Sequence, residues 1–365
     1  MADSPTTAAP TSAGRTRPRW WPFAKVVLLL AATALAAWAI SGKTDELSGA
    51  SAYLDNLDWG WMAVAAIVEG LSYVAFAAMQ RRLLQAGKVR APLGPMTGVT
   101  LAGNAIQNSL PAGIVVSAAY AFRWYRRFGA DDVLAGWVIV AMTVLSLMSL
   151  SALAAVGLAL AASSGSALDL VEVILGQAAA MAILVAAWTR RSWFMSHSVR
   201  AVRLSQRVTR HPVGEPEDIV RAARIRVSAI TPTRQDWIVA GAMGACNWIF
   251  DLACLVSAFF AVNAEIPWRG LLLAYAAAQL ATNLPITPGG LGVVEGSLTI
   301  ALVAFGGGEA STVAAVLVYR LFNFWALLPV GWSACGVLSI KARHTRERNV
   351  ATRALTLNVT EFPAP

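Results

Sequence analysis

The residues between Asn283 and Glu295 are suited to binding an anion, because they interrupt a long apolar run with glycines and a carboxylate. The glycines are Gly289, Gly290 and Gly292. A helix that begins after them would present free backbone amides and the positive end of its dipole, which favour a phosphate or a carboxylate. Arg320 could add a guanidinium, whose planar N–H groups bind phosphate in pairs. These residue types predict a site for an anionic group.

Glu295 and Arg320 each have two interpretations. Glu295 would lie in the first helical turn, where a negative side chain is favoured, so it could cap the helix or take part in transport. Arg320 could form a structural ion pair with Glu295 or Asp251, or it could hold a phosphate that passes through the site. The spacing of these residues does not distinguish the alternatives.

Other polar residues lie inside apolar runs, where an ionisable group costs at least ~2.5 kcal/mol and needs a partner or a function. Asn247 and Asp251 share one helical face, as do Arg320 and Asn323. Glu69 lies on a semi-polar face in the first half of the chain. A carboxylate without a partner would be protonated, which permits coupling to proton movement.

A second interrupted apolar segment occupies residues 97–122. It contains the turn sequence Asn-Ser-Leu-Pro-Ala-Gly, which starts at Asn108, and Arg123 follows it directly. Basic residues flank both ends of this segment, so we expect a re-entrant hairpin that enters from the cytoplasmic side. Asn108 and Arg123 are therefore further candidates for the substrate site.

The composition is that of a polytopic membrane protein, with 57% hydrophobic and 13% charged residues among 365. The net charge of +9 comes largely from arginines just outside the apolar runs, so membrane topology explains it better than nucleic-acid binding. The three cysteines fall within predicted spans and the three histidines are scattered. We therefore expect no disulfide framework, no metal site and no cofactor.

The positive-inside rule predicts an all-α polytopic fold with about six full spans and two broken, oppositely oriented hairpins. The expected spans are 25–40, 61–79, 134–162, 168–188, 237–262 and 312–340, and the broken segments are 97–122 and 271–305. Residues 25–40 could alternatively be a cleaved signal peptide. Paired broken segments in two halves are typical of an inverted-repeat transporter, although Asn, Pro and Gly are also common in ordinary turns.

The flanking segments are expected to be cytoplasmic. Residues 1–19 should be a disordered tail, residues 20–340 the transmembrane domain, and residues 341–365 a second tail. Within the domain, residues 189–236 form a basic cytoplasmic loop that could lie on anionic headgroups or simply connect two spans. This topology predicts a multi-pass plasma-membrane protein with both termini in the cytoplasm.

Four motifs resemble the lysylphosphatidylglycerol synthase transmembrane region family. They are Asn-x-x-x-Thr-Pro-Gly-Gly-x-Gly-x-x-Glu from Asn283, Asn-Trp-x-x-Asp from Asn247, Val-Tyr-Arg-x-x-x-Phe-Trp from Val318, and Asn-x-Leu-Pro-x-Gly from Asn108. In that family the membrane region is regarded as a flippase, often joined to a soluble aminoacyltransferase domain. The resemblance implies lipid translocation, and we expect a stand-alone member without the transferase domain.

The leading hypothesis is a lipid flippase or scramblase, not an enzyme, with membrane lipids as its partners. Its substrate would be an anionic phospholipid, a glycolipid or a polyprenyl-phosphate-linked lipid. One alternative is a non-transporting partner of a cell-envelope synthase that docks through residues 189–236. A membrane-embedded transferase is less favoured, because no Asp-x-Asp motif or His-rich loop is present.

Overall fold

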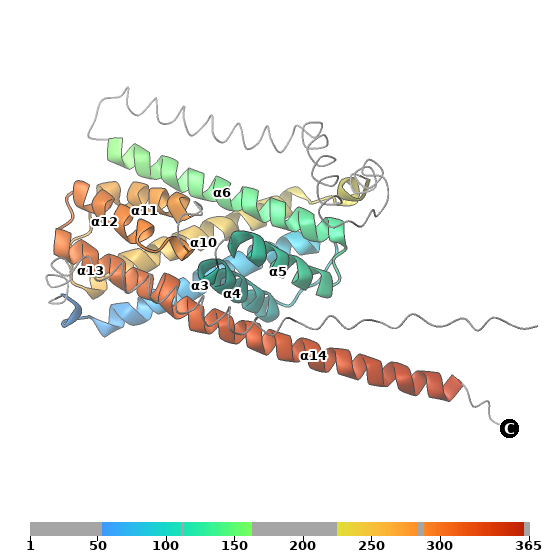
Figure 1. Cartoon of the computed structure of the whole chain (residues 1–365). Coiled ribbons are helices and arrows are strands. Elements are labelled where there is room, and N and C mark those ends of the chain that lie inside the picture. The colour runs from blue at the N-terminus through green and yellow to red at the C-terminus, as the bar shows by residue number, and fades with distance from the viewer. Residues whose placement is uncertain (1–52, 111–112, 163–224, 283–287, 361–365) are drawn as a thin grey trace, which may run out of the picture. The chain divides into compact units, whose positions relative to one another are not determined.

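The computed structural model (Figure 1) describes residues 53–110, 113–162, 225–282 and 288–360. These residues belong to one compact unit, Thr44–Pro365, and every regular element among them is helical. Two predicted spans, 25–40 and 168–188, lie outside the described residues. Asn283 and most of the predicted cytoplasmic loop, residues 189–224, lie outside them as well.

The described helices form two sets with the same order of lengths. The first set is α3 (Trp59–Ala86), α4 (Leu93–Ser109), α5 (Gly113–Arg127) and α6 (Asp132–Ala162). The second set is α10 (Arg234–Ala261), α11 (Trp268–Thr282), the 3₁₀ turn η1 (Pro288–Gly290), α12 (Val293–Ala304), α13 (Glu309–Arg320), the π-helical segment η2 (Leu321–Ala326) and α14 (Leu327–Thr360). Each set is a long helix, two shorter helices and a final long helical stretch.

Four helical stretches in the described parts of the chain are long and apolar enough to cross a membrane. They are Trp59–Ala86, Asp132–Ala161, Arg234–Ala261 and Glu309–Ala342. They coincide with four of the six expected spans, and α14 continues as a helix to Thr360. The chain is therefore an all-helical, polytopic membrane protein.

The long helices α3 and α10 pack side by side in opposite directions (Figure 1). At one end of the pair, the Asp58 amide donates to the Ala261 carbonyl at 2.8 Å. At the other end, Arg82 Nε lies 2.8 Å from Asp236 Oδ1. Because α4 follows the end of α3 and α11 follows the end of α10, the two short-helix pairs start at opposite ends of the bundle.

The two short pairs, α4–α5 and α11–α12, occupy equivalent places in the two sets. The helix α4 packs against α14, the last helix of the second set, and α11 packs against α6, the last helix of the first. At about 1.5 Å per residue, helices of 15 and 12 residues such as α11 and α12 are too short to cross a hydrocarbon core of about 30 Å alone. The arrangement has the form of an inverted repeat with two broken helical pairs.

Two glycines allow close packing at the equivalent helix contacts of the two sets, α14 with α4 and α6 with α11. A Cβ added at Gly331 of α14 would overlap the Leu101 carbonyl of α4, and one added at Gly157 of α6 would overlap Leu272 and Leu273 of α11. Small residues of this kind let the backbones of membrane helices approach each other. The packing of each broken pair therefore depends on one glycine of the other set.

Two apolar clusters form the core and leave a polar layer between them. On α3, Ala65 belongs to one cluster and Ala77 to the other, with Glu69 between them. On α10, Ala240 and Cys254 belong to the two clusters in the same way, with the partly buried Asn247 and the buried Asp251 between them. The polar residues therefore lie near the middle of the α3–α10 pair.

Candidate functional site

A cavity of about 410 Å³ opens at this polar layer, with walls from both helix sets. Its polar lining includes Glu69, Asn104, Asn108, Asn247, Asp251 and Arg320. Thr282 and Gly289, on either side of the break between α11 and α12, also line it, as do Leu110 and Gly113 at the break between α4 and α5. Both breaks therefore border the same cavity.

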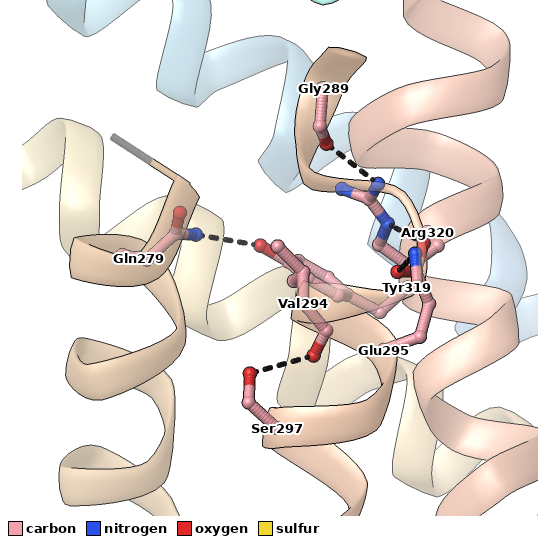
Figure 2. Close-up of polar contacts among 8 residues, drawn as sticks. Gln279, Gly289, Val294, Glu295, Ser297, Tyr319 and Arg320 are labelled. Carbon is pink, nitrogen blue, oxygen red and sulfur yellow. Dashed lines mark hydrogen bonds and ion pairs between the residues drawn. The ribbon is translucent and has the colours of Figure 1, made fainter. Parts of the chain in front are cut away.

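Arg320, at the end of α13, is 2% exposed and lines this cavity. Figure 2 shows its guanidinium between the Gly289 carbonyl and the Glu295 side chain. Nε donates to Glu295 Oε1 at 2.6 Å, and Nη2 donates to the Gly289 carbonyl at 3.1 Å. The Cζ atom also lies 4.6 Å from the centre of the Phe324 ring. Arg320 is thus held in one orientation by a carboxylate, a carbonyl and an aromatic face.

Glu295 caps a helix and forms an ion pair with the same side chain. Its Oε2 accepts from the Gly292 amide at 2.7 Å, in the first turn of α12, while Oε1 accepts from Arg320. The expected cap and an ion pair are both present, and the Arg320 partner is Glu295 rather than Asp251. The two contacts tie the start of α12 to the end of α13.

The glycines before α12 are required by backbone geometry. Gly289 and Gly292 have φ values of 62° and 79°, in the left-handed region that side chains disfavour. A Cβ at Gly289 would also overlap the Phe324 ring. Gly290 is buried and Gly292 is exposed as the N-cap residue, so these two glycines shape the turn, whereas Gly289 lines the cavity.

Asp251 of α10 is surrounded by hydrogen-bond donors. Its Oδ2 accepts from the Tyr275 hydroxyl, from Gln279 Nε2 at 2.6 Å and from the Tyr319 hydroxyl at 3.0 Å. Its Oδ1 accepts from Asn323 Nδ2 at 2.7 Å. Hydrogen bonds of this kind favour an ionised carboxylate. They also join α10, α11, α13 and η2 at one point.

Glu69 faces this network from α3. Its Oε1 lies 3.3 Å from Asn323 Nδ2, so one amide donates to carboxyl groups of both helix sets. The Asn323 carbonyl accepts from the Tyr73 hydroxyl at 3.3 Å. Asn323 belongs to the π-helical segment, and such segments recur at functional sites because they alter the backbone hydrogen-bond pattern.

The first-set wall has its own polar contacts. Gln80 of α3 donates to the Thr100 hydroxyl at 3.1 Å and accepts from the Tyr125 hydroxyl at 2.8 Å. The side-chain amide of Asn247 on α10 forms a hydrogen bond of 3.1 Å with the Ser72 hydroxyl on α3. The Gln80 contacts join α3 to α4 and α5, and the Asn247 contact joins α3 to α10 beside the cavity.

Five of the predicted site residues line the cavity, namely Gly289, Arg320, Asn247, Asp251 and Asn108. Glu295 lies beside the cavity as the partner of Arg320. Arg123 is exposed and does not line it.

The sequence did not identify Tyr275, Gln279 and Tyr319 as site residues. Tyr275 and Gln279 are four residues apart on one face of the apolar helix α11, which is the signal that could have identified them.

A model of the family described as "Lysylphosphatidylglycerol synthase TM region" matches residues 16–331, which include every described helix from α3 to η2, the start of α14 and every residue that lines the cavity. A search of curated proteins found no match. The matched region includes the Asn247, Asn283 and Arg320 motifs and most of the chain. The chain therefore belongs to the lysylphosphatidylglycerol synthase transmembrane region family.

Proposed function

We propose that the protein moves a lipid with a phosphate-containing headgroup between the two leaflets of the membrane, as a flippase or scramblase. The observation that carries this proposal is the polar cavity bordered by both broken helix pairs, with a buried arginine in its wall. A headgroup needs a polar path through an apolar layer, and irregular backbone at membrane depth is tolerated only where it is buried in protein or lines such a cavity.

The size and lining of the cavity suit a headgroup. Its volume of about 410 Å³ lies within the range of about 300 to 1,000 Å³ that is typical of small-molecule sites. Amides and hydroxyls, including those of Asn104, Asn108 and Tyr73, line it alongside charged groups. These side chains can replace some of the water that a headgroup loses when it leaves the membrane surface.

Arg320 supplies the positive charge. Glu295 and the Gly289 carbonyl orient its guanidinium at the cavity wall, so binding a phosphate there costs little side-chain entropy. The same geometry supports the class of substrate, which can be an anionic phospholipid, a glycolipid with a phosphate link or a polyprenyl phosphate. The sugar or glycerol part would contact the neutral polar wall.

The inverted repeat supports a mechanism of alternating access. Two sets of helices related by inversion can exchange conformations, so that a site between them opens first to one side and then to the other. The short helices α4–α5 and α11–α12 start at opposite ends of the bundle and border the cavity from both sides. We place the protein in the plasma membrane with both termini in the cytoplasm, in accordance with the distribution of arginines.

The proposal is tested by a headgroup-accessibility assay in proteoliposomes. Labelled phosphatidylglycerol, phosphatidylcholine and a polyprenyl phosphate, and a phosphate-free glycosyldiacylglycerol as the control, are each exposed to a membrane-impermeant quencher. We expect faster loss of the inner-leaflet signal than in empty vesicles for a phosphate-headgroup lipid. Arg320→Lys should slow this loss about tenfold or more, because it loses at least one charge-assisted hydrogen bond.

Arg123→Lys is the matched control, because Arg123 is exposed and outside the cavity. It should transport lipid at the wild-type rate. Equal rates in wild-type and empty vesicles for all lipid classes would refute the proposal. That result would favour the alternative of a non-transporting partner of a cell-envelope synthase.

A further inference from the structure

Two carboxyl groups, one from each helix set, share a single amide donor at the centre of the protein. Asn323 Nδ2 lies 2.7 Å from Asp251 Oδ1 and 3.3 Å from Glu69 Oε1. Glu69 is 3% exposed and Asp251 is 4% exposed. Two carboxylates so close together in a buried site repel each other, so both are not ionised at once without a counter-charge.

The hydrogen-bond partners differ between the two groups. Asp251 accepts from two tyrosine hydroxyls and two amides, which together solvate a negative charge. For Glu69, no described side chain hydrogen bonds to the buried Oε2. A buried anionic oxygen without donors is costly, whereas a protonated carboxyl avoids that cost. The proton of the pair therefore belongs on Glu69.

The surrounding charges do not compensate a Glu69 carboxylate. The titratable groups that face it are Asp251 and Cys254 of α10 and Tyr73 of α3. Tyr275 of α11 and Tyr319 of α13 also interact with the pair, and all of these groups are neutral or negative. Arg320 is the nearby cation on the cavity wall, and its ion pair is with Glu295.

We propose that Glu69 is a proton-binding site and that its protonation is linked to the binding of a phosphate headgroup in the same cavity. Protonation forms the Oε2–H bond with a proton taken from water at the open side of the cavity, and no other bond changes. The headgroup adds negative charge to a cavity that Glu69 also lines, so each binding event favours the other. The empty site already holds this proton at neutral pH, and the proton passes to water together with the headgroup when the site opens to the other side.

This linkage rests on the proposed lipid transport, whereas the proton on Glu69 can be measured without any lipid. Infrared spectra of the purified protein at neutral pH should contain the carbonyl band of a protonated carboxylic acid. Glu69→Gln should remove this band, and the matched control Glu309→Gln should retain it, because Glu309 is exposed. If Glu69→Gln does not fold, Glu69→Asp should shift the band. A wild-type spectrum without the band, or a band that persists in Glu69→Gln, would overturn the assignment.

The linkage is tested in the same proteoliposomes with and without a pH gradient. In the wild type, a gradient of one pH unit should shift the lipid distribution between leaflets by up to about tenfold if one proton accompanies each lipid. Glu69→Gln should lose this shift, so that its lipid distribution between leaflets is the same with and without the gradient. Glu309→Gln should retain the shift.

The two proposals fail in different ways. If the wild type moves lipid but a pH gradient has no effect, the linkage is refuted and the transport proposal stands. If Glu69→Gln keeps the gradient response, the linkage is also refuted. If the wild type moves no lipid, the transport proposal and the linkage both fail, while the infrared band still decides where the proton resides.

Discussion

Replacing Glu295 by alanine should destabilise the protein strongly, because this side chain has two partners in different elements. Its Oε1 lies 2.6 Å from Arg320 Nε, and its Oε2 accepts from the Gly292 amide at 2.7 Å. The Arg320 side chain is 3% exposed and the Glu295 side chain 23% exposed. The substitution therefore leaves a buried guanidinium with the Gly289 carbonyl as its remaining described hydrogen-bond partner.

The magnitude follows from these two contacts. Breaking a buried ion pair by removal of one partner costs about 3–5 kcal/mol. Loss of a helix cap costs about 1 kcal/mol more. Because Glu295 is partly exposed, water screens some of this loss, and we expect a total near the lower end of the summed range, about 4 kcal/mol. A matched control, Glu309→Ala, removes an exposed carboxylate from the first turn of α13 and should stay within about 0.5 kcal/mol of the wild type.

Unfolding of the purified protein in detergent measures this effect, and a double-mutant cycle assigns it to the pair. Arg320→Met in the Glu295→Ala background removes the stranded charge, so the double variant should be more stable than Glu295→Ala alone. A loss below about 0.5 kcal/mol in Glu295→Ala would refute the argument. Simple additivity of the two single variants would refute it as well, because contacting residues must show coupling.

Two further predictions concern packing and capping. Gly331→Ala and Gly157→Ala should each lower the free energy of unfolding by about 1–3 kcal/mol, because a methyl group there overlaps the α4 or α11 backbone. Gly336→Ala, on the open side of α14, should change it little. Equal unfolding temperatures for all three variants would contradict this prediction. Asp58→Ala should lower the free energy of unfolding by about 1 kcal/mol, because the Asp58 side chain accepts hydrogen bonds from two amides at the start of α3. Amide hydrogen exchange should become faster in the first turn of that helix and not in its last turn.

Local patterns in the sequence predicted the helical elements and the points where they break. Hydrophobic run length identified four helices that the structure describes as long enough to span a membrane. The glycines around residue 290 predicted a new helix from Gly292, which is present. They left capping as one of two roles for Glu295, and the cap is present. These features depend on neighbours within a few residues, so periodicity, glycine and proline were sufficient to predict them.

The pairing of charges required the tertiary structure. From the sequence, Glu69, Asp251 or Glu295 could have paired with Arg320. In the structure Glu295 is its partner, and the antiparallel packing of α3 and α10 brings Glu69 and Asp251 to the same side-chain amide, that of Asn323. The rotation of α5 turned Arg123 away from the cavity that Asn108 lines. Contacts between residues about 70 to 250 positions apart depend on the register and rotation of packed helices. A local sequence pattern carries almost no information on these quantities, because many registers bury the same apolar surface equally well.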